Sequence, residues 1–294
     1  MLVLAAAAAY GLIELPAGVT RLYLNIGSSI DPMMAPDNNF SHTIAVEPIS
    51  GCTIRERTRD ARSGLGGINV IHAAVSDRSG LSTMGVFNVY GVSSSLASPA
   101  QKHEKWADQP PKLVPVVSMT TILDSLPPPP LELWYLKTDM QGFDFTAVGS
   151  AEPRLLRRAH YLNTEVYLGG VATYEGVSND YCSQWLPFML SQGFVPVGLQ
   201  QETPRPKRQL LGLEALPPNS SAAEYLSRAH SFCAWMQKKQ EALRDRKDNA
   251  HFPSPWEADA IWVRNDTWLP EPPNVKNFHW PVYRGLKNKK LPSR

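Results

Sequence analysis

The chain predicts an α/β fold: a doubly wound, mostly parallel sheet of seven strands, with a helical insertion before the last strand. Apolar runs of strand length recur between about residues 20 and 200, and stretches of helical or loop character separate them. Strands that alternate with helices form a parallel sheet with helices on both of its faces. The composition agrees, because 43% hydrophobic and 19% charged residues are typical of a globular chain.

Each expected strand is a short apolar run. The first five end at residues that favour turns or cannot extend a strand, namely Gly27, Glu47, Ser76, Asp139 and Gly169. The seven strands are expected over residues 21–26, 42–46, 69–75, 131–138, 161–168, 193–199 and 259–264. Helical spacing predicts helices over 54–62, 145–159 and 181–192.

One domain is expected over residues 20–268, with an insertion over about 203–258. Within it, residues 222–247 place apolar side chains on one helical face, at positions 222, 225, 226, 229, 232, 233, 236 and 243. Residues 1–19 are expected to form an N-terminal helix or a signal-like segment, and 269–294 an irregular basic tail.

Composition excludes several classes of function. The net charge is +2 and the basic residues are scattered, so no nucleic-acid partner is expected. Cys52, Cys182 and Cys233 are far apart and form no CxxC pair, so neither a zinc site nor a disulfide framework is implied. No two histidines have the spacing of a metal-binding helix, and no metal is expected.

The apolar N-terminal run resembles the core of a signal peptide without its positive flank. Glu14 and Pro16 interrupt it too early for a membrane-spanning helix, so no stable membrane span is expected. Sequons at Asn39, Asn219 and Asn265 matter only if the chain enters the secretory pathway. The compartment stays open, with the cytosol slightly favoured over the secretory pathway, and so does the oligomeric state.

Polar or small residues follow the expected strands, at the edge of the sheet where α/β proteins bind ligands. Gly27 directly follows the first strand, and Ser28 can cap the next helix. Glu47 lies 20 residues beyond Gly27, where an acid can accept both hydroxyls of a ribose; the alternative is a helix-capping glutamate. Asp77 can accept from an adenine amino group, or it belongs to a turn over residues 76–80.

Seven short segments carry a resemblance to a known family. They are residues 24–27 (LNIG), 45–48 (AVEP), 73–77 (AAVSD), 93–96 (SSSL), 117–126 (VSMTTILDSL), 136–142 (LKTDMQG) and 261–264 (IWVR). In order and spacing they resemble the FkbM-type methyltransferase family over roughly residues 20–265. The resemblance implies a class I, Rossmann-like fold, S-adenosylmethionine as methyl donor, and an oxygen acceptor on a small molecule or a carbohydrate. Carried onto this chain, it assigns cofactor binding to Asn25, Gly27, Ser28, Glu47, Pro48, Ser76 and Asp77.

The chain departs from the family pattern in the cofactor loop. Asn25 stands where the family usually has Asp, and Ser28, Ser29 and Asp31 replace its usual Ala, Asn and Gly. Gln141 stands where Glu is common. Asn25 offers an oxygen acceptor without a charge, so it would hold the ammonium group of the cofactor less strongly.

The expected chemistry is proton removal from an acceptor hydroxyl held in line with the donor's methyl group. Asp139 follows the fourth strand, and Lys137 lies on the same side of that strand, so the pair can act as base and orienting cation or form a structural ion pair. Glu165 either contacts substrate or binds a backbone N–H, and Ser95 either lines the pocket or belongs to a loop. A magnesium-assisted variant with Asp139 and Glu165 as ligands is conceivable, but the spacing does not require it.

Three rival functions remain to be weighed. A non-catalytic protein that keeps the fold to bind the cofactor or a protein partner is favoured by Asn25, Asp31 and Gln141. An NAD-dependent dehydrogenase would carry a fuller G-x-G-x-x-G after the first strand, and a serine hydrolase a G-x-S-x-G turn. The sequence contains neither motif where it is needed.

Overall fold

The structure is a computed structural model of all 294 residues. It describes residues 13, 15–29, 32, 35, 40–49, 68–87, 94–98, 108–169, 174–201, 208–209, 221–244 and 256–267.

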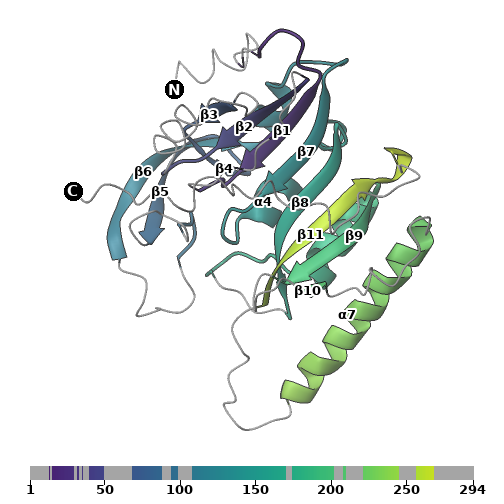
Figure 1. The fold of residues 1–294 in the computed structure, drawn as a ribbon. Helices are drawn as coiled ribbons and strands as arrows, with labels where there is room; N and C mark the ends of the chain where they lie inside the picture. Colours follow the sequence, from purple (N-terminus) through teal and green to yellow (C-terminus); the bar gives the residue numbers. More distant parts are fainter. Residues whose placement is uncertain are drawn as a thin grey trace, which may run out of the picture.

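A large mixed sheet forms the centre of the molecule (Figure 1). Its strand order is β10-β9-β11-β8-β7-β1-β2-β3. The strands are β1 (Arg21–Ile26), β2 (Ser41–Val46), β3 (Ile68–Ile71), β7 (Glu132–Thr138), β8 (Ala159–Leu168), β9 (Phe194–Gln201), β10 (Arg208–Gln209) and β11 (Trp256–Arg264). Six of the seven expected strands are present in this sheet over most of their length, and the third only in its first part, as β3. The two-residue β10, which was not expected, makes an eighth strand.

The sheet reverses its order beside β1. From β1 the chain adds β2 and β3 on one side, then returns to add β7 and β8 on the other, and all five of these strands are parallel. β11 is antiparallel to both of its neighbours, β8 and β9. β8 is buried along nearly its whole length, as expected for a central strand covered on both faces. The point of reversal lies between β1 and β7.

A second, three-stranded sheet corrects the expected third strand. The run over residues 69–75 is not one strand, because the chain turns at His72 and Ala73, where Ala73 N–H donates to the Ile71 carbonyl at 3.1 Å. Residues beyond the turn form β4 (Ala74–Ser76), which pairs with β6 (Asp108–Ser118), and β6 pairs with β5 (Gly80–Phe87). The only mark of this turn in the run is one polar residue, His72, and the second sheet was not predicted.

Short helices link the strands. The expected helix over 145–159 consists of two, α4 (Asp144–Gly149) and α5 (Pro153–Leu156), because Pro153 has no N–H to continue a helix and begins α5 instead. The expected helix over 181–192 is confirmed as a π-helical turn, η1 (Tyr181–Trp185), followed by α6 (Leu186–Ser191). A 3-10 turn, η3 (Asn265–Thr267), follows β11.

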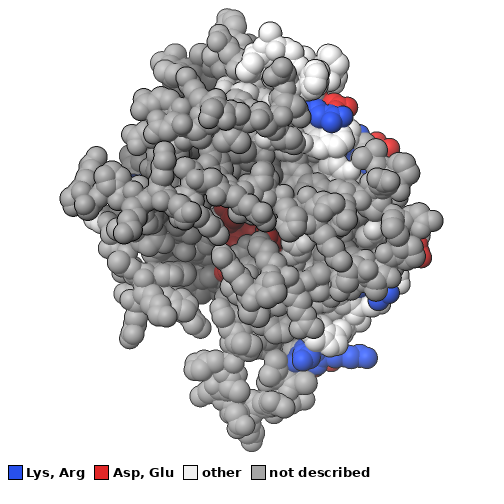
Figure 2. Space-filling view, in the orientation of Figure 1, with Lys and Arg blue, Asp and Glu red and all other residues white. Residues whose placement is uncertain are grey.

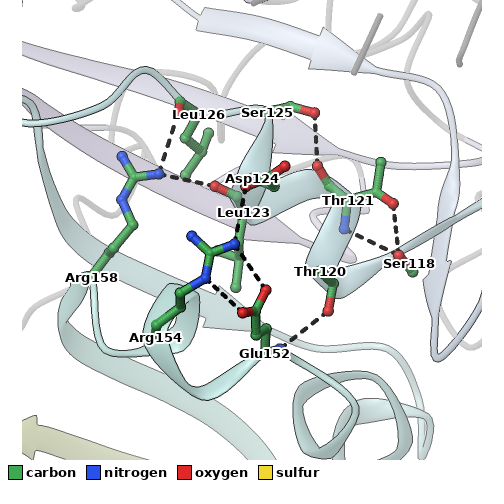
Figure 3. Close-up of polar contacts among 10 residues, drawn as sticks. All are labelled: Ser118, Thr120, Thr121, Leu123, Asp124, Ser125, Leu126, Glu152, Arg154 and Arg158. Atoms are coloured by element: carbon green, nitrogen blue, oxygen red, sulfur yellow. Dashed lines mark hydrogen bonds and ion pairs between the residues drawn. The ribbon is translucent and has the colours of Figure 1, made fainter. Parts of the chain in front are cut away.

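Helix α3 (Met119–Asp124) is fixed at both ends by polar contacts (Figure 3). At its start, Ser118 accepts a hydrogen bond from the Thr121 backbone N–H at 3.1 Å. At its end, the Arg158 guanidinium donates to the carbonyls of Leu123 and Leu126, at 3.0 and 3.3 Å. These bonds satisfy groups that a helix leaves free at its ends. They attach the segment before β7 to the one before β8.

Helix α7 (Ala222–Arg244) packs along β9, and its buried side chains lie on the expected face: Tyr225, Ala229, Phe232 and Met236. A disulfide joins Cys182 of η1 to Cys233 of this helix, with Cα atoms 5.5 Å apart. The expectation that no disulfide is implied was therefore wrong. The two cysteines are 51 residues apart, and only the packing of α7 against η1 brings them together.

Several expectations lie outside the described residues. They are most of the N-terminal segment 1–19, the helix over 54–62, Asp31, the sequons at Asn39 and Asn219, and the tail 269–294. Among the described residues, no helix combines the length and the hydrophobicity that a membrane crossing requires.

Candidate functional site

A cavity of about 180 Å³ lies at the carboxyl ends of β1, β2 and β7, where the strand order reverses. This is the position at which open α/β sheets bind ligands. Its walls include Gly27, Glu47, Pro48 and Asp139, which follow these three strands. Figure 2 shows acidic side chains at the floor of a hollow near the middle of one face of the molecule.

The turn after β1 requires a glycine because two backbones meet there. Gly27 has a φ of +71°, and a Cβ at this position would lie 1.8 Å from the Asp139 carbonyl oxygen. Gly27 N–H donates to the Val46 carbonyl at 2.9 Å, and Asp139 N–H donates to the Ile26 carbonyl at 3.0 Å. The Gly27 backbone thus lies directly against the Asp139 backbone at the end of β7.

Glu47 joins the turns after β1 and β2. Its side chain is almost completely buried; Oε2 accepts from Ser29 N–H at 2.8 Å and Oε1 from Ile49 N–H at 2.7 Å. Each carboxylate oxygen can accept more than one hydrogen bond. The two backbone N–H groups hold the carboxylate in place at the cavity wall.

Three buried side-chain oxygens near this turn have no hydrogen-bond partner among the described residues. They are Asn25 Oδ1, Ser28 Oγ and Ser29 Oγ. Ser29 lines the cavity, whereas Asn25 and Ser28 do not. Buried polar atoms are nearly always paired in folded proteins, and an orphaned atom beside a cavity is a natural contact for a polar ligand. Ser29 and the carboxylates of Glu47 and Asp139 on the cavity wall thus fit a ligand with hydroxyl or amino groups.

At the end of β7, both oxygens of Asp139 are engaged. Lys137 Nζ lies 2.8 Å from Oδ2, and Gln141 Nε2 donates to Oδ1 at 3.1 Å. The side chain of Asp139 is 27% exposed and that of Lys137 14%, so the aspartate is the more accessible of the two. The predicted pair is formed, and Asp139 is its member at the cavity wall.

Gln141 connects this pair to Tyr174 and Glu165. Tyr174 Oη donates to Gln141 Oε1 at 3.0 Å, and Gln141 Nε2 also approaches Glu165 Oε1 at 3.4 Å. Burial and the nearby charge of Glu165 raise the pKa of Tyr174, so its hydroxyl remains a donor. Since the tyrosine donates to Oε1, the amide group must point its N–H bonds at the two carboxylates.

Asp144, in the first turn of α4, is a buried carboxyl group near the site. Both of its oxygens lie 3.2 Å from the Met140 backbone N–H. Burial and, second, the neighbouring charge of Asp139 together raise the pKa of Asp144 from 3.8 to about 7, although its hydrogen bonds oppose this rise.

The structure brings only part of the predicted site to the cavity. Ser76 and Asp77 do not line it: Ser76 ends β4, and its Oγ donates to Asp77 Oδ1 at 2.8 Å. The residues that line this wall are Ala73, Ala74 and Val75. Ser95 and Glu165 lie behind it: Ser95 Oγ donates to the Gln141 carbonyl at 2.9 Å, and Glu165 meets the amide of the same residue.

Sequence reasoning missed Tyr174 and Asp144. Tyr174 stands alone in a loop, and nothing in its spacing links it to Gln141, 33 residues earlier. Asp144 carried a usable signal, since it is an acid in the first turn after the predicted strand end. The described residues contain no cluster of three or more His, Cys, Asp or Glu side chains able to hold a metal ion.

Comparisons with known proteins add little. No protein-family model matches the chain, and no curated protein matches its sequence. Among solved structures, the chain is similar to the crystal structure of the [4+2]-cyclase SpnF, with 12% sequence identity and a TM-score of 0.33. The alignment covers 90% of this chain and 80% of that one. A TM-score this low carries no argument about fold or function.

Proposed function

We propose that the chain is an S-adenosylmethionine-dependent methyltransferase of the FkbM type, acting on a hydroxyl of a small molecule or a carbohydrate. One observation carries this proposal: Gly27, Glu47 and Asp139, from three strand ends far apart in the sequence, line one cavity where the sheet reverses its order.

The sheet topology supports the fold that the proposal assumes. Five parallel strands reverse their order beside β1, and one antiparallel strand, β11, lies between β8 and β9. This is the arrangement expected of a class I methyltransferase sheet. A dehydrogenase fold would not require the antiparallel strand.

The cavity walls near β1 and β2 support the proposed binding of S-adenosylmethionine. Glu47 is positioned to accept from ribose hydroxyls, and the free oxygen of Ser29 lies on the same wall. At about 180 Å³ the cavity is smaller than the roughly 300–1,000 Å³ of pockets that enclose most of a ligand, so a nucleoside cofactor would extend beyond it. The bound cofactor would supply an activated methyl group.

The residues at the end of β7 support the proposed activation of an acceptor hydroxyl. Asp139 lies at the cavity wall, and Lys137 and Gln141 fix the position of its carboxylate. A carboxylate held in this way can accept the proton of a hydroxyl group that binds beside it. We assign Asp139 as the base and Lys137 as the cation that orients it.

A non-catalytic protein with the same fold is the second candidate, and one observation favours it. Both Asp139 oxygens already accept strong hydrogen bonds, from Lys137 and from Gln141. An aspartate used only to close the strand end would look the same. Cofactor binding without methyl transfer would identify this candidate.

Calorimetric titration of the purified chain with S-adenosylmethionine tests the proposed cofactor binding. Glu47→Gln keeps the shape of the side chain and should weaken binding about 10- to 100-fold, the range for a hydrogen bond to a charged group. Glu132→Gln is the matched control, since Glu132 pairs with Arg21 on the exposed side of the molecule and should bind as wild type does. No binding at millimolar ligand would refute the proposal.

A methyl-transfer assay tests the proposed activity on an acceptor hydroxyl. A cell extract incubated with the chain and an isotopically labelled donor should yield a labelled product that mass spectrometry identifies. Asp139→Asn should abolish labelling and leave cofactor affinity within a few-fold of wild type. Asp124→Asn is the control, because Asp124 is exposed on α3 and pairs weakly with Arg154 at 3.9 Å. Full labelling by Asp139→Asn would remove Asp139 from the base role.

A further inference from the structure

The Cys182–Cys233 disulfide is placed as a structural bridge. Neither cysteine lines the candidate cavity, and both are partly buried against the main core. The bridge joins α7 to η1, beside the buried rings of Tyr181 and Phe232, whose centroids are 6.2 Å apart. A bridge in such a place supports packing and takes no part in the chemistry of the cavity.

Structural disulfides persist where the surroundings are oxidising, and they are rare in the cytosol, where thiols are kept reduced. Among the described side chains of helix α7, those of Tyr225, Ala229, Phe232 and Met236 are buried, and the bridge adds a covalent attachment to these contacts. A structural disulfide makes the three sequons relevant, because they can be glycosylated only on a chain that matures in an oxidising, secretory compartment.

One sequon lies within the described residues and is accessible. Asn265 begins η3, directly after β11, and its side chain is exposed. Its backbone N–H donates to the Gly193 carbonyl at 2.9 Å, which fixes the backbone and leaves the side-chain amide at the surface. The next residue, Asp266, is held by Arg264 and not by the Asn265 amide.

A modification at Asn265 would not obstruct the candidate cavity. β11 runs antiparallel to β8, and its end, Val263 and Arg264, pairs with Tyr161 and Phe194 at the beginnings of β8 and β9. The cavity lies at the ends of β1, β2 and β7, which is the opposite edge of the sheet (Figure 1). A bulky group is therefore tolerated where this sequon lies.

We propose that the chain matures in an oxidising secretory compartment, where Cys182 and Cys233 form a permanent bridge and Asn265 carries an N-linked glycan. The Asn265 side-chain amide nitrogen forms a bond to the anomeric carbon of an oligosaccharide; the bond from that carbon to a lipid-linked pyrophosphate donor breaks, and the pyrophosphate leaves as the amide nitrogen loses a proton. The modifying enzyme recognises the Asn265-Asp266-Thr267 sequence. The two thiols lose two electrons and two protons to a disulfide of the compartment's oxidising machinery, which is reduced to a dithiol. The inference does not depend on the methyltransferase proposal.

The test expresses the full chain in cultured eukaryotic cells behind a cleavable secretion signal. Enzymatic release of N-glycans in ¹⁸O-labelled water, followed by peptide mass mapping, should mark Asn265 as occupied, separately from Asn39 and Asn219. A non-reduced digest should contain the Cys182–Cys233 peptide pair. Folded, secreted protein with an unmodified Asn265, or with both thiols free, would overturn the proposal.

Variants give matched controls. Asn265→Gln should lose the mark at this site and keep the melting temperature of the deglycosylated protein, whereas Asp266→Ala should keep the mark because the middle residue is not read. The double variant Cys182→Ala/Cys233→Ala should melt roughly 10 °C lower than the bridged protein. An unchanged melting temperature would show that the bridge is dispensable and would overturn the compartment argument.

Discussion

Replacing Asp144 by asparagine should lower the stability of the protein at pH 5 and raise it at pH 8. Asp144 is completely buried, and its backbone partner is the Met140 N–H. The asparagine side chain has the same shape, and its oxygen can accept from the same N–H. It differs in two respects: it never carries a charge, and its amide has two N–H donors where a protonated carboxyl group has one O–H.

The magnitude follows from the shift in pKa. The folded-state pKa of Asp144 is about 7, against 3.8 for the ordinary group, so folding favours the protonated form. For an acid whose folded pKa is raised, stability is fully present below the unfolded pKa and is lost as pH rises to the folded pKa. At about 1.4 kcal/mol per pH unit, the wild type should lose roughly 3 kcal/mol between pH 5 and pH 7, and little more above it.

Urea unfolding at pH 5, 6, 7 and 8 measures this directly. The unfolding free energy of Asp144→Asn minus that of the wild type should be about 1–2 kcal/mol negative at pH 5, because the amide brings one more donor into the buried site than the protonated carboxyl group does. It should rise by roughly 3 kcal/mol and become positive by pH 8. Asp124→Asn, at an exposed position, should show no such change. A difference for Asp144→Asn that stays constant over this range would refute the raised pKa and its cause.

Three further predictions concern the same framework. Gly27→Ala should lower the free energy of unfolding by more than about 3 kcal/mol, measured by urea unfolding, because its Cβ would meet the Asp139 carbonyl at a positive φ; a loss below 1 kcal/mol would contradict the close approach. Breaking the disulfide by Cys182→Ala/Cys233→Ala should cost about 4 kcal/mol, from the entropy of closing a 51-residue loop, and unfolding with and without reductant should then coincide. Tyr174→Phe should cost about 1 kcal/mol for one hydrogen bond, whereas Gln141→Glu should cost more at pH 8 than at pH 5, since it sets a third carboxyl group against Asp139 and Glu165; equal losses at both pH values would remove Gln141 from the contact.

The strands of the main sheet could be predicted because their signal is local. A buried parallel strand is a short apolar run with a turn residue at its end, and β1, with Gly27 directly after it, shows both features. β6 lacks them: it begins Asp-Gln-Pro-Pro, and its sheet is formed by pairing with β4 and β5. Pairing between distant segments determines such a strand, and no window of sequence contains that information.

The site divides in the same way. Gly27, Glu47 and Asp139 could be predicted to lie together because the ends of neighbouring parallel strands share one edge of the sheet. Ser76 and Asp77 were assigned to that edge by the same reasoning, but the turn at His72 and Ala73 carries them into the second sheet. The rule for strand ends holds only when the strand is continuous, and here a single polar residue, His72, marks the interruption in the sequence.

Gln141 has partners that its place in the sequence does not indicate. Taken alone, an amide where the resembled family commonly has Glu predicts weaker cofactor binding. In the structure the amide accepts from Tyr174 and turns its donors toward Asp139 and Glu165, a role that an ionised carboxylate cannot fill because it has no N–H or O–H to donate. Gln141 therefore forms one hydrogen-bonded arrangement with Tyr174, Asp139 and Glu165.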